Sequence, residues 1–287
     1  MLGFSKIARA GVVAVAMLGG GCASIIESQT GALADNLSNA IYNNPDVESV
    51  KAAVPTFLIM IDGLIETAPE STSLLAAGAS LNDAYGGQFV TDPARKKFFS
   101  TKALGYSRRA ACGFDDQLCD LQNIPFEDFQ TIVAELDEDS VAYAYGLAGS
   151  WLNWVQTHSD DWAAVADLSR VEALLLRVVE IDPLMDNGLP HLYLGGLATL
   201  LPPALGGKPE EGKAHFEKGK EVSGGKNLMA NVVYAERYAR LVFNQELHDE
   251  LLQEVLDAPN DTPGLMLYNA VAKQQAAALL ESGKDYF

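Results

Sequence analysis

The stretch SRVEALLLRVVEIDPLMDNGLPHLYLGGLATLLPPAL, residues 169–205, contains one unit of the predicted fold. An apolar stripe at helical spacing begins one residue before the stretch and runs through its first half, which predicts an amphipathic helix: Leu168, Val171, Leu175, Val178 and Ile181. Ser169 and Glu172 are spaced as a capping box, which predicts the helix start, and Asp182-Pro183 predicts its end. The second half is uncharged as far as Pro202-Pro203. The stretch therefore predicts two helices joined by a short turn.

The same plan occurs in residues 45–89, where an amphipathic helix ends at Ala68-Pro69 and a helix rich in small residues follows. Pro55 lies inside the first of these helices and is expected to kink or split it. A single helix pair cannot bury its own apolar face, so such pairs must stack on one another. Runs of alternating polarity that would indicate strands are missing. We therefore predict an all-α fold, a tetratricopeptide-like array of about ten to twelve antiparallel helices in one domain, residues 44–287. The spacing of the units is too irregular for a strict repeat array.

Residues 141–158 form an uncharged run, VAYAYGLAGSWLNWVQTH, which approaches the length of a membrane span. Asn153, Gln156 and His158 argue instead for a helix that is buried in the protein on most sides.

The N-terminus indicates export. Residues 1–21 carry two basic residues, then a short apolar segment, and end in three consecutive glycines, which is typical of a secretory signal peptide. The segment resembles a bacterial lipoprotein signal, in which the following cysteine, here Cys22, becomes the lipidated first residue. An ordinary signal peptide with a chance cysteine is the alternative. Residues 22–43 are expected to be a lipid-anchored linker and a first helix. We expect a periplasmic protein bound to the membrane only through its lipid, and Ala23 favours the outer over the inner membrane.

Charge and motifs exclude several functions. The formal charge of −18 disfavours binding to nucleic acid, because neutralising phosphates requires a basic surface. The sequence has no CxxC, HExxH, P-loop or GxSxG motif. Its four histidines are far apart in sequence: His158, His191, His215 and His248. We therefore expect no enzyme activity, no cofactor and no metal site, and we expect His248 to lie on the surface.

Cys112 and Cys119 are the two remaining cysteines, in the segment CGFDDQLC. An exported protein meets an oxidising compartment, so we expect a disulfide between them. Two reduced thiols, one of them buried, are the alternative.

Five segments resemble one known family. They are VPTFLIMIDGLIETAPES (54–71), LLAAGASLNDAYGGQFV (74–90), WLNWVQTHSDDWAAVADLSRVEALLLRVVEIDP (151–183), HLYLGGLATLLPPALGGKPEEGKAHFEKG (191–219) and GGKNLMANVVYAERYARLVFNQELHDELLQEVL (224–256). In this order they are similar to the T component (TatT) of tripartite ATP-independent periplasmic (TRAP) transporters. The resemblance implies a periplasmic lipoprotein of tetratricopeptide-like helices that works beside the transporter's solute-binding protein. It also implies assembly as a trimer around a central opening.

Aromatic and polar side chains at the inner groove of such an array are candidates for binding a small organic ligand. The candidates are Tyr85, Trp151, Asn153, Trp154, His191, Tyr193, Asn227, Tyr234, Arg237 and Tyr238. Tyr234, Arg237 and Tyr238 are expected to share one helix face, where the guanidinium could clamp a carboxylate. Simple packing between helices, or a structural salt bridge at Arg237, is the alternative. We expect a transport accessory that docks the solute-binding protein and aids transfer of a carboxylate or hydrophobic ligand. A general envelope scaffold for outer-membrane or cell-wall assembly is the alternative function.

Overall fold

The computed structural model describes residues 36–287, so the predicted signal peptide, Cys22 and most of the predicted linker lie outside the described residues. The described chain is 76% helical and contains no strand, which confirms the all-α prediction. After a short helical segment at 36–42, the first six helices are α2 (Val47–Thr67), α3 (Thr72–Gln88), α4 (Pro93–Phe114), α5 (Phe126–Glu135), α6 (Val141–Thr157) and α7 (Trp162–Ala166). The others are α8 (Leu168–Ile181), α9 (Leu189–Ala198), α10 (Pro209–Val222), α11 (Met229–Tyr234), α12 (Gln245–Asp257) and α13 (Met266–Tyr286).

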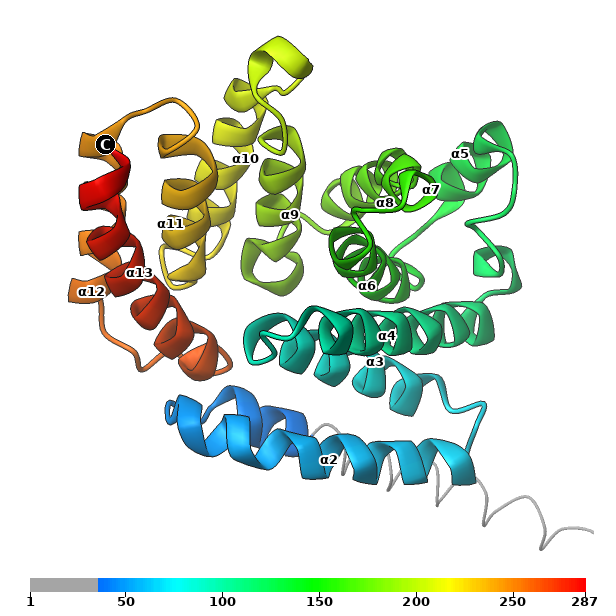
Figure 1. Ribbon diagram of the computed structural model, residues 1–287. Coiled ribbons are helices and arrows are strands. Elements are labelled where there is room, and N and C mark those ends of the chain that lie inside the picture. The colour runs from blue at the N-terminus through cyan, green and yellow to red at the C-terminus, as the bar shows by residue number, and fades with distance from the viewer. Residues whose placement is uncertain (1–35) are drawn as a thin grey trace, which may run out of the picture.

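Helices that follow one another along the chain pack side by side, as a helical array requires. The most extensive contacts join α3 to α4, α4 to α6 and α9 to α10. Figure 1 shows that the succession of helices curves around, so that α13 returns to the neighbourhood of α2 and α3. The predicted stripe of residues 168–181 is the buried face of α8, with Val171, Leu175 and Val178 fully enclosed.

Contacts between the two ends of the described chain turn the curved array into a ring. A single hydrophobic cluster includes Val54 and Leu58 of α2 together with Val271 and Ala276 of α13. The backbone N–H of Gly264 donates to Oδ1 of Asn43 at 2.7 Å. A second hydrophobic cluster, centred on α6 and α8, occupies the other side of the ring. The core is thus continuous across the point where the first and last helices meet.

One prediction about a helix end is wrong. The expected capping box at Ser169 does not form, because α7 runs into α8 with only Asp167 between them and the Ser169 hydroxyl bonds back to the Ala166 carbonyl at 3.3 Å. Pro55 does not split α2. The carbonyl that it leaves without a partner belongs to Lys51, which lies on an exposed turn where water can reach it.

His248 is fully buried, contrary to the expectation that it lies on the surface. Its Nδ1 lies 2.8 Å from an Asp249 carboxylate oxygen, and its Nε2 accepts from Nε of Arg240 at 3.2 Å. Gly283 of α13 packs directly on the imidazole of His248, because a Cβ at that position would lie 2.9 Å from His248 Cε1. The acidic residues that follow it, Asp249 and Glu250, favoured a position facing solvent. The end of α13 covers this side of α12, which is why His248 is buried instead.

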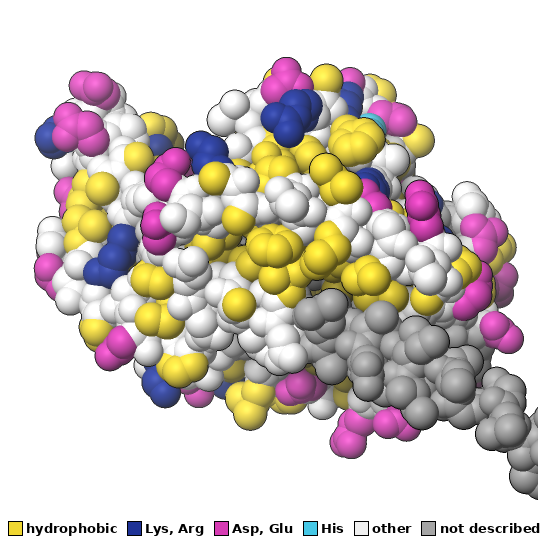
Figure 2. Space-filling model, turned by 90° about the horizontal axis from the view of Figure 1, so that it is seen from below, with side chains coloured by type: hydrophobic (Ala, Val, Ile, Leu, Met, Phe, Trp, Pro, Cys, Tyr) yellow, Lys and Arg dark blue, Asp and Glu magenta, His cyan; other side chains and the backbone are white. Residues whose placement is uncertain are grey.

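The surface of the described chain is predominantly acidic and carries some exposed apolar side chains. Within residues 36–287, every helix is too short or too polar to cross a bilayer. Figure 2 views the molecule from the α2 side, where hydrophobic side chains gather across the middle of the face and many acidic ones lie toward its edges. On α2, Ile59 is 74% exposed and Met60 is 39% exposed.

Candidate functional site

Four tyrosines and two aspartates from separate parts of the chain lie close together at the inner side of the ring, where burial and neighbouring groups raise the pKa values of the tyrosines. We call Tyr42, Tyr145, Tyr193, Tyr268, Asp83 and Asp186 the tyrosine cluster. The tyrosines come from the segment 36–42, α6, α9 and α13, and the aspartates come from α3 and the turn before α9. Ring closure is what brings Tyr268, near the start of α13, within the electrostatic range of Tyr42 and Asp186.

Asp83 is bonded to α6. The Ser150 hydroxyl donates to one of its carboxylate oxygens, and Nδ2 of Asn153 donates to the other at 2.6 Å. Burial outweighs these two hydrogen bonds and raises the pKa of Asp83 to about 6. The carboxylate is therefore ionised at neutral pH at a cost in stability, and a pKa perturbed by burial makes Asp83 a candidate functional residue.

A left-handed turn holds Asp186. Asp186 and Asn187 have φ of 44° and 53°, and Gly188 follows with φ of 80°. Asp, Asn and Gly are the residues that tolerate this conformation best. The turn allows Oδ2 of Asp186 to accept from the Tyr145 hydroxyl at 2.6 Å.

Tyr145 and Tyr193 stack with ring centroids 6.5 Å apart. Gly149 of α6 lies beside the Tyr193 ring, since a Cβ added there would be in ordinary van der Waals contact with Tyr193 Cε2 at 3.7 Å. Burial raises the pKa of Tyr145, Tyr193 and Tyr268 well above the ordinary value for a phenol. Each of these side chains nevertheless keeps part of its surface accessible to solvent.

The family follows from a comparison with protein-family profiles. The profile described as TRAP transporter T-component matches residues 43–287. The chain belongs to this family. This confirms the resemblance found in the sequence. No curated protein gave a significant match to the chain. Membership assigns the chain an accessory role in TRAP transport, associates it with a TRAP system and fits a location in the periplasm or envelope.

Of the candidate residues inferred from sequence, Asn153 and Tyr193 lie at the tyrosine cluster of this T-component. Trp151 is 1% exposed, and its indole N–H donates to Asp167 at 3.0 Å. Trp154 stacks on His158 with ring centroids 4.6 Å apart. Tyr85 is buried edge-on against Phe99. These three aromatic side chains pack within the array.

The candidates in the C-terminal half are dispersed. Tyr234 and Tyr238 are buried, and their hydroxyls donate to Glu217 and Glu210 of α10 at 3.2 and 3.1 Å. The Arg237 side chain is 52% exposed, so it does not share their face. A π-helical turn, Ala235–Ala239, changes the helical register between these residues. The carboxylate clamp expected from their spacing is therefore not assembled in the described structure.

His191 and His215 face each other, although they are far apart in sequence. Their Nδ1 atoms lie 3.1 Å apart, and burial together with the neighbouring imidazole lowers the pKa of His191 to about 4. No group of three potential metal ligands occurs among residues 36–287. Asn227 is buried and donates to the carbonyl of Asn187 at 3.3 Å, so it supports the turn that holds Asp186.

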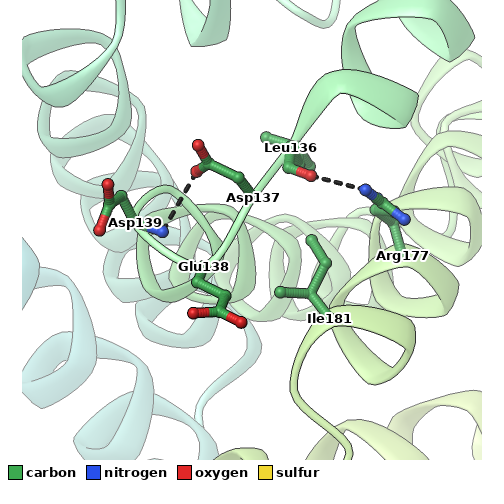
Figure 3. Close-up of a pocket in the computed structure, with 6 residues that line it drawn as sticks. All are labelled: Leu136, Asp137, Glu138, Asp139, Arg177 and Ile181. Atoms are coloured by element: carbon green, nitrogen blue, oxygen red, sulfur yellow. Dashed lines mark hydrogen bonds between the residues drawn. The ribbon is translucent and has the colours of Figure 1, made fainter.

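A surface pocket between α8 and the loop that joins α5 to α6 is a weaker candidate site. Figure 3 shows it lined by Leu136, Asp137, Glu138, Asp139, Arg177 and Ile181. Its one basic residue is already used, since Arg177 donates to the Leu136 carbonyl at 2.7 Å and to Glu180 at 2.9 Å. Asp137 accepts from the backbone of Asp139 and caps the turn. These side chains already bond within the protein, so the pocket has few polar groups left to recognise a ligand.

The two cysteines are joined in the structure. The Cα atoms of Cys112 and Cys119 lie 4.4 Å apart, at the end of α4, and the sulfur atoms are bonded. The oxidation state of this pair in solution remains a prediction, which is tested below.

Proposed function

We propose that this T-component is a lipid-anchored periplasmic protein that docks the solute-binding subunit of its TRAP system and assists the transfer of a small organic ligand. The family match supports the place in a TRAP system. The observation that carries the ligand-handling role is the tyrosine cluster, where polar and aromatic groups from distant helices converge on the inside of the ring. Such convergence of a few polar groups among aromatic ones is the usual composition of a small-molecule site.

The proposed anchor is Cys22. It lies 14 positions before the first described residue, so an acyl chain there would tether the ring to a membrane through a short linker. Cys22→Ser should move the protein from the membrane fraction to the soluble periplasmic fraction. A variant that stays in the membrane fraction, or a wild-type protein found in the cytosol, would contradict the anchor.

The α2 side of the ring is the proposed docking surface. Its exposed apolar residues Ile59 and Met60 could enter the core of an interface, and the acidic groups around them favour a partner with a basic patch. Charge complementarity of this kind would make docking sensitive to salt.

The experiment is a binding measurement between the purified full chain in detergent and the solute-binding protein from the same TRAP system. Ile59→Glu should weaken binding at least tenfold, because it places a charge in the apolar part of the interface. Leu200→Glu is the matched control, since Leu200 is also an exposed aliphatic side chain but lies in the loop between α9 and α10, away from α2. Equal binding by both variants would reject the α2 surface.

Failure of the wild-type protein to bind at low salt, even with cross-linking, would reject docking itself. If the protein captured outer-membrane barrel proteins or cell-wall enzymes instead of the solute-binding protein, the result would favour the alternative function as a general envelope scaffold. The mass of the free protein measured by light scattering would test the trimer that the family resemblance implies.

A further inference from the structure

The charges at the tyrosine cluster are of one sign. Among described residues, Asp83 and Asp186 are the charged groups with the largest effects on the pKa values of Tyr42 and Tyr193, and both raise them. Asp186 has the same effect on Tyr145 and Tyr268. Arg237, the basic residue that was expected to bind a carboxylate, is exposed and is not part of the tyrosine cluster.

The carboxylates keep capacity for a further partner. Each oxygen of Asp83 accepts one hydrogen bond, from Ser150 or Asn153, and Asp186 accepts one from Tyr145. An ionised carboxylate has about four acceptor positions. These donors are neutral, so neither negative charge is compensated by a salt bridge in the described structure.

The chemistry of these groups selects among ligand classes. An organic anion would be repelled by both carboxylates, more strongly by the partly buried Asp83 than by Asp186, which is exposed. A purely hydrophobic ligand would further desolvate Asp83 without compensating its charge. An organic ammonium ion satisfies both demands, because its charge pairs with the carboxylates and its alkyl groups pack on the negative faces of tyrosine rings.

We propose that the tyrosine cluster binds a small organic cation, held between the stacked rings of Tyr145 and Tyr193 and the carboxylates of Asp83 and Asp186. This inference rests on the proposed ligand-handling role and narrows the ligand to amines or quaternary ammonium compounds. It replaces the carboxylate ligand expected from the spacing around Arg237.

Isothermal titration of the full chain in detergent at pH 8 tests the ligand class with matched probes. The cations are choline, tetramethylammonium and putrescine. The neutral control is 3,3-dimethyl-1-butanol, which has the shape of choline without its charge, and isovalerate supplies the anion. At least one cation should bind with a Kd below about 10 mM, on the order expected for a small fragment, and choline should bind at least tenfold more tightly than its neutral analogue. Absence of binding by all three cations, or equal binding by the neutral or anionic probe, would overturn the proposal.

Variants separate the charge from the rings. Asp186→Asn keeps the shape, the left-handed turn and an acceptor for Tyr145, yet should weaken cation binding at least fivefold. Tyr193→Phe should bind nearly as wild type because the ring remains, whereas Tyr193→Leu should lose at least tenfold. Asp139→Asn, an exposed carboxylate outside the cluster, should bind as wild type. Thermal melting shows whether each variant is folded. Unchanged cation binding in both Asp186→Asn and Tyr193→Leu would reject the site.

The response to pH gives an independent readout. The groups that act on Asp83 from the packed elements are Ser150 and Asn153 on α6, and Asp83 in turn acts on the phenols of Tyr42 and Tyr193. None of these four side chains titrates between pH 5 and 8. Since the pKa of Asp83 is raised to about 6, cation affinity should increase between pH 5 and pH 7.5. Asp83→Asn should remove that increase, and a pH dependence that survives the substitution would contradict the role of Asp83.

The two proposals can fail separately. Binding of the solute-binding protein without any cation binding would reject this inference and leave docking intact. Cation binding without docking would keep the site and reject the transport partner.

Discussion

The backbone N–H of Gly264 donates to Oδ1 of Asn43 at 2.7 Å, which joins residues 221 positions apart in the sequence. This bond lies where the first and last helices of the array meet. A second contact between the two ends joins α13 to α3, where Nε2 of Gln275 donates to Oε1 of Gln88 at 3.3 Å. Because Tyr268 follows Gly264 closely and Tyr42 adjoins Asn43, closing the ring and assembling the tyrosine cluster are one structural event.

Asn43→Ala should therefore loosen the closure. The substitution also removes the bond from Asn43 Nδ2 to the Asn39 carbonyl, and loss of these two exposed hydrogen bonds is expected to lower the free energy of unfolding by about 1–2 kcal/mol. Urea unfolding measures this value, and hydrogen exchange should show faster exchange at the start of α13. Asn123→Ala removes a comparable exposed amide outside the closure and should leave α13 unaffected. Identical exchange at α13 in both variants would show that the bond to Asn43 is dispensable.

Asp83→Asn should stabilise the protein at alkaline pH. The folded-state pKa of about 6 lies above the ordinary value of 3.8, so ionising Asp83 costs the folded protein stability as pH rises through this interval. The cost approaches a limit on the order of 2–3 kcal/mol above pH 7. Asn can keep bonds to Ser150 and Asn153 without the charge. Urea unfolding should show a more stable variant at pH 8, by about 1–3 kcal/mol, and a much smaller difference at pH 4. A variant that is less stable than wild type at pH 8 would refute this account.

Gly188→Ala should disrupt the turn that holds Asp186. A Cβ at Gly188 would lie 2.7 Å from the Gly219 carbonyl oxygen, and the φ of 80° disfavours any L side chain. We expect a loss of about 2–4 kcal/mol in the free energy of unfolding.

Gly63→Ala is the matched control for this substitution. Gly63 lies on an exposed turn of α2, and a Cβ added there would meet no atom within 4 Å, so alanine should stabilise the helix by about 0.5–1 kcal/mol. Thermal melting distinguishes the two glycines by the sign of the shift. A neutral Gly188→Ala would show that the turn can rearrange.

The Cys112–Cys119 pair should be oxidised in the exported protein. Thiol titration of the unfolded, unreduced Cys22→Ser variant should find no reactive thiol, whereas two would refute the disulfide. Closing a loop of this length restricts the unfolded chain, so replacing both cysteines with alanine should cost about 2–3 kcal/mol. Adding reductant should lower the melting temperature of the Cys22→Ser protein and leave the double alanine variant unchanged.

Much of the fold could be predicted because local signals carry it. The apolar stripe through Val171 and Val178 has the helical period, and the Asp-Pro and Ala-Pro pairs end helices through the missing amide hydrogen of proline. These signals lie within short segments and predict helical hairpins. Hairpins of this kind must stack to bury their apolar faces. The failures were also local in origin: Ser169 and Glu172 have the capping spacing, but α7 occupies the place where a free helix start was expected.

The candidate site was less predictable. Asp83 carried a usable signal, since it is the only acidic residue between Ser71 and Phe89, and Asp186-Asn187-Gly188 has the composition of a left-handed turn. Tyr268 had no such signal. The face expected for Arg237 was wrong because a π-helical turn shifts the register by part of a turn, which periodicity alone does not reveal.

The sequence by itself determined an all-α array of stacked hairpins, the family to which it belongs and the acidic character of its surface. Tertiary structure alone decided that the array closes, that His248 is buried and that six side chains from six segments converge inside the ring. The physical reason is the range of the interactions. Helix periodicity and capping act within a few residues, whereas the small rotation between successive hairpins adds up along the chain and fixes whether its ends meet.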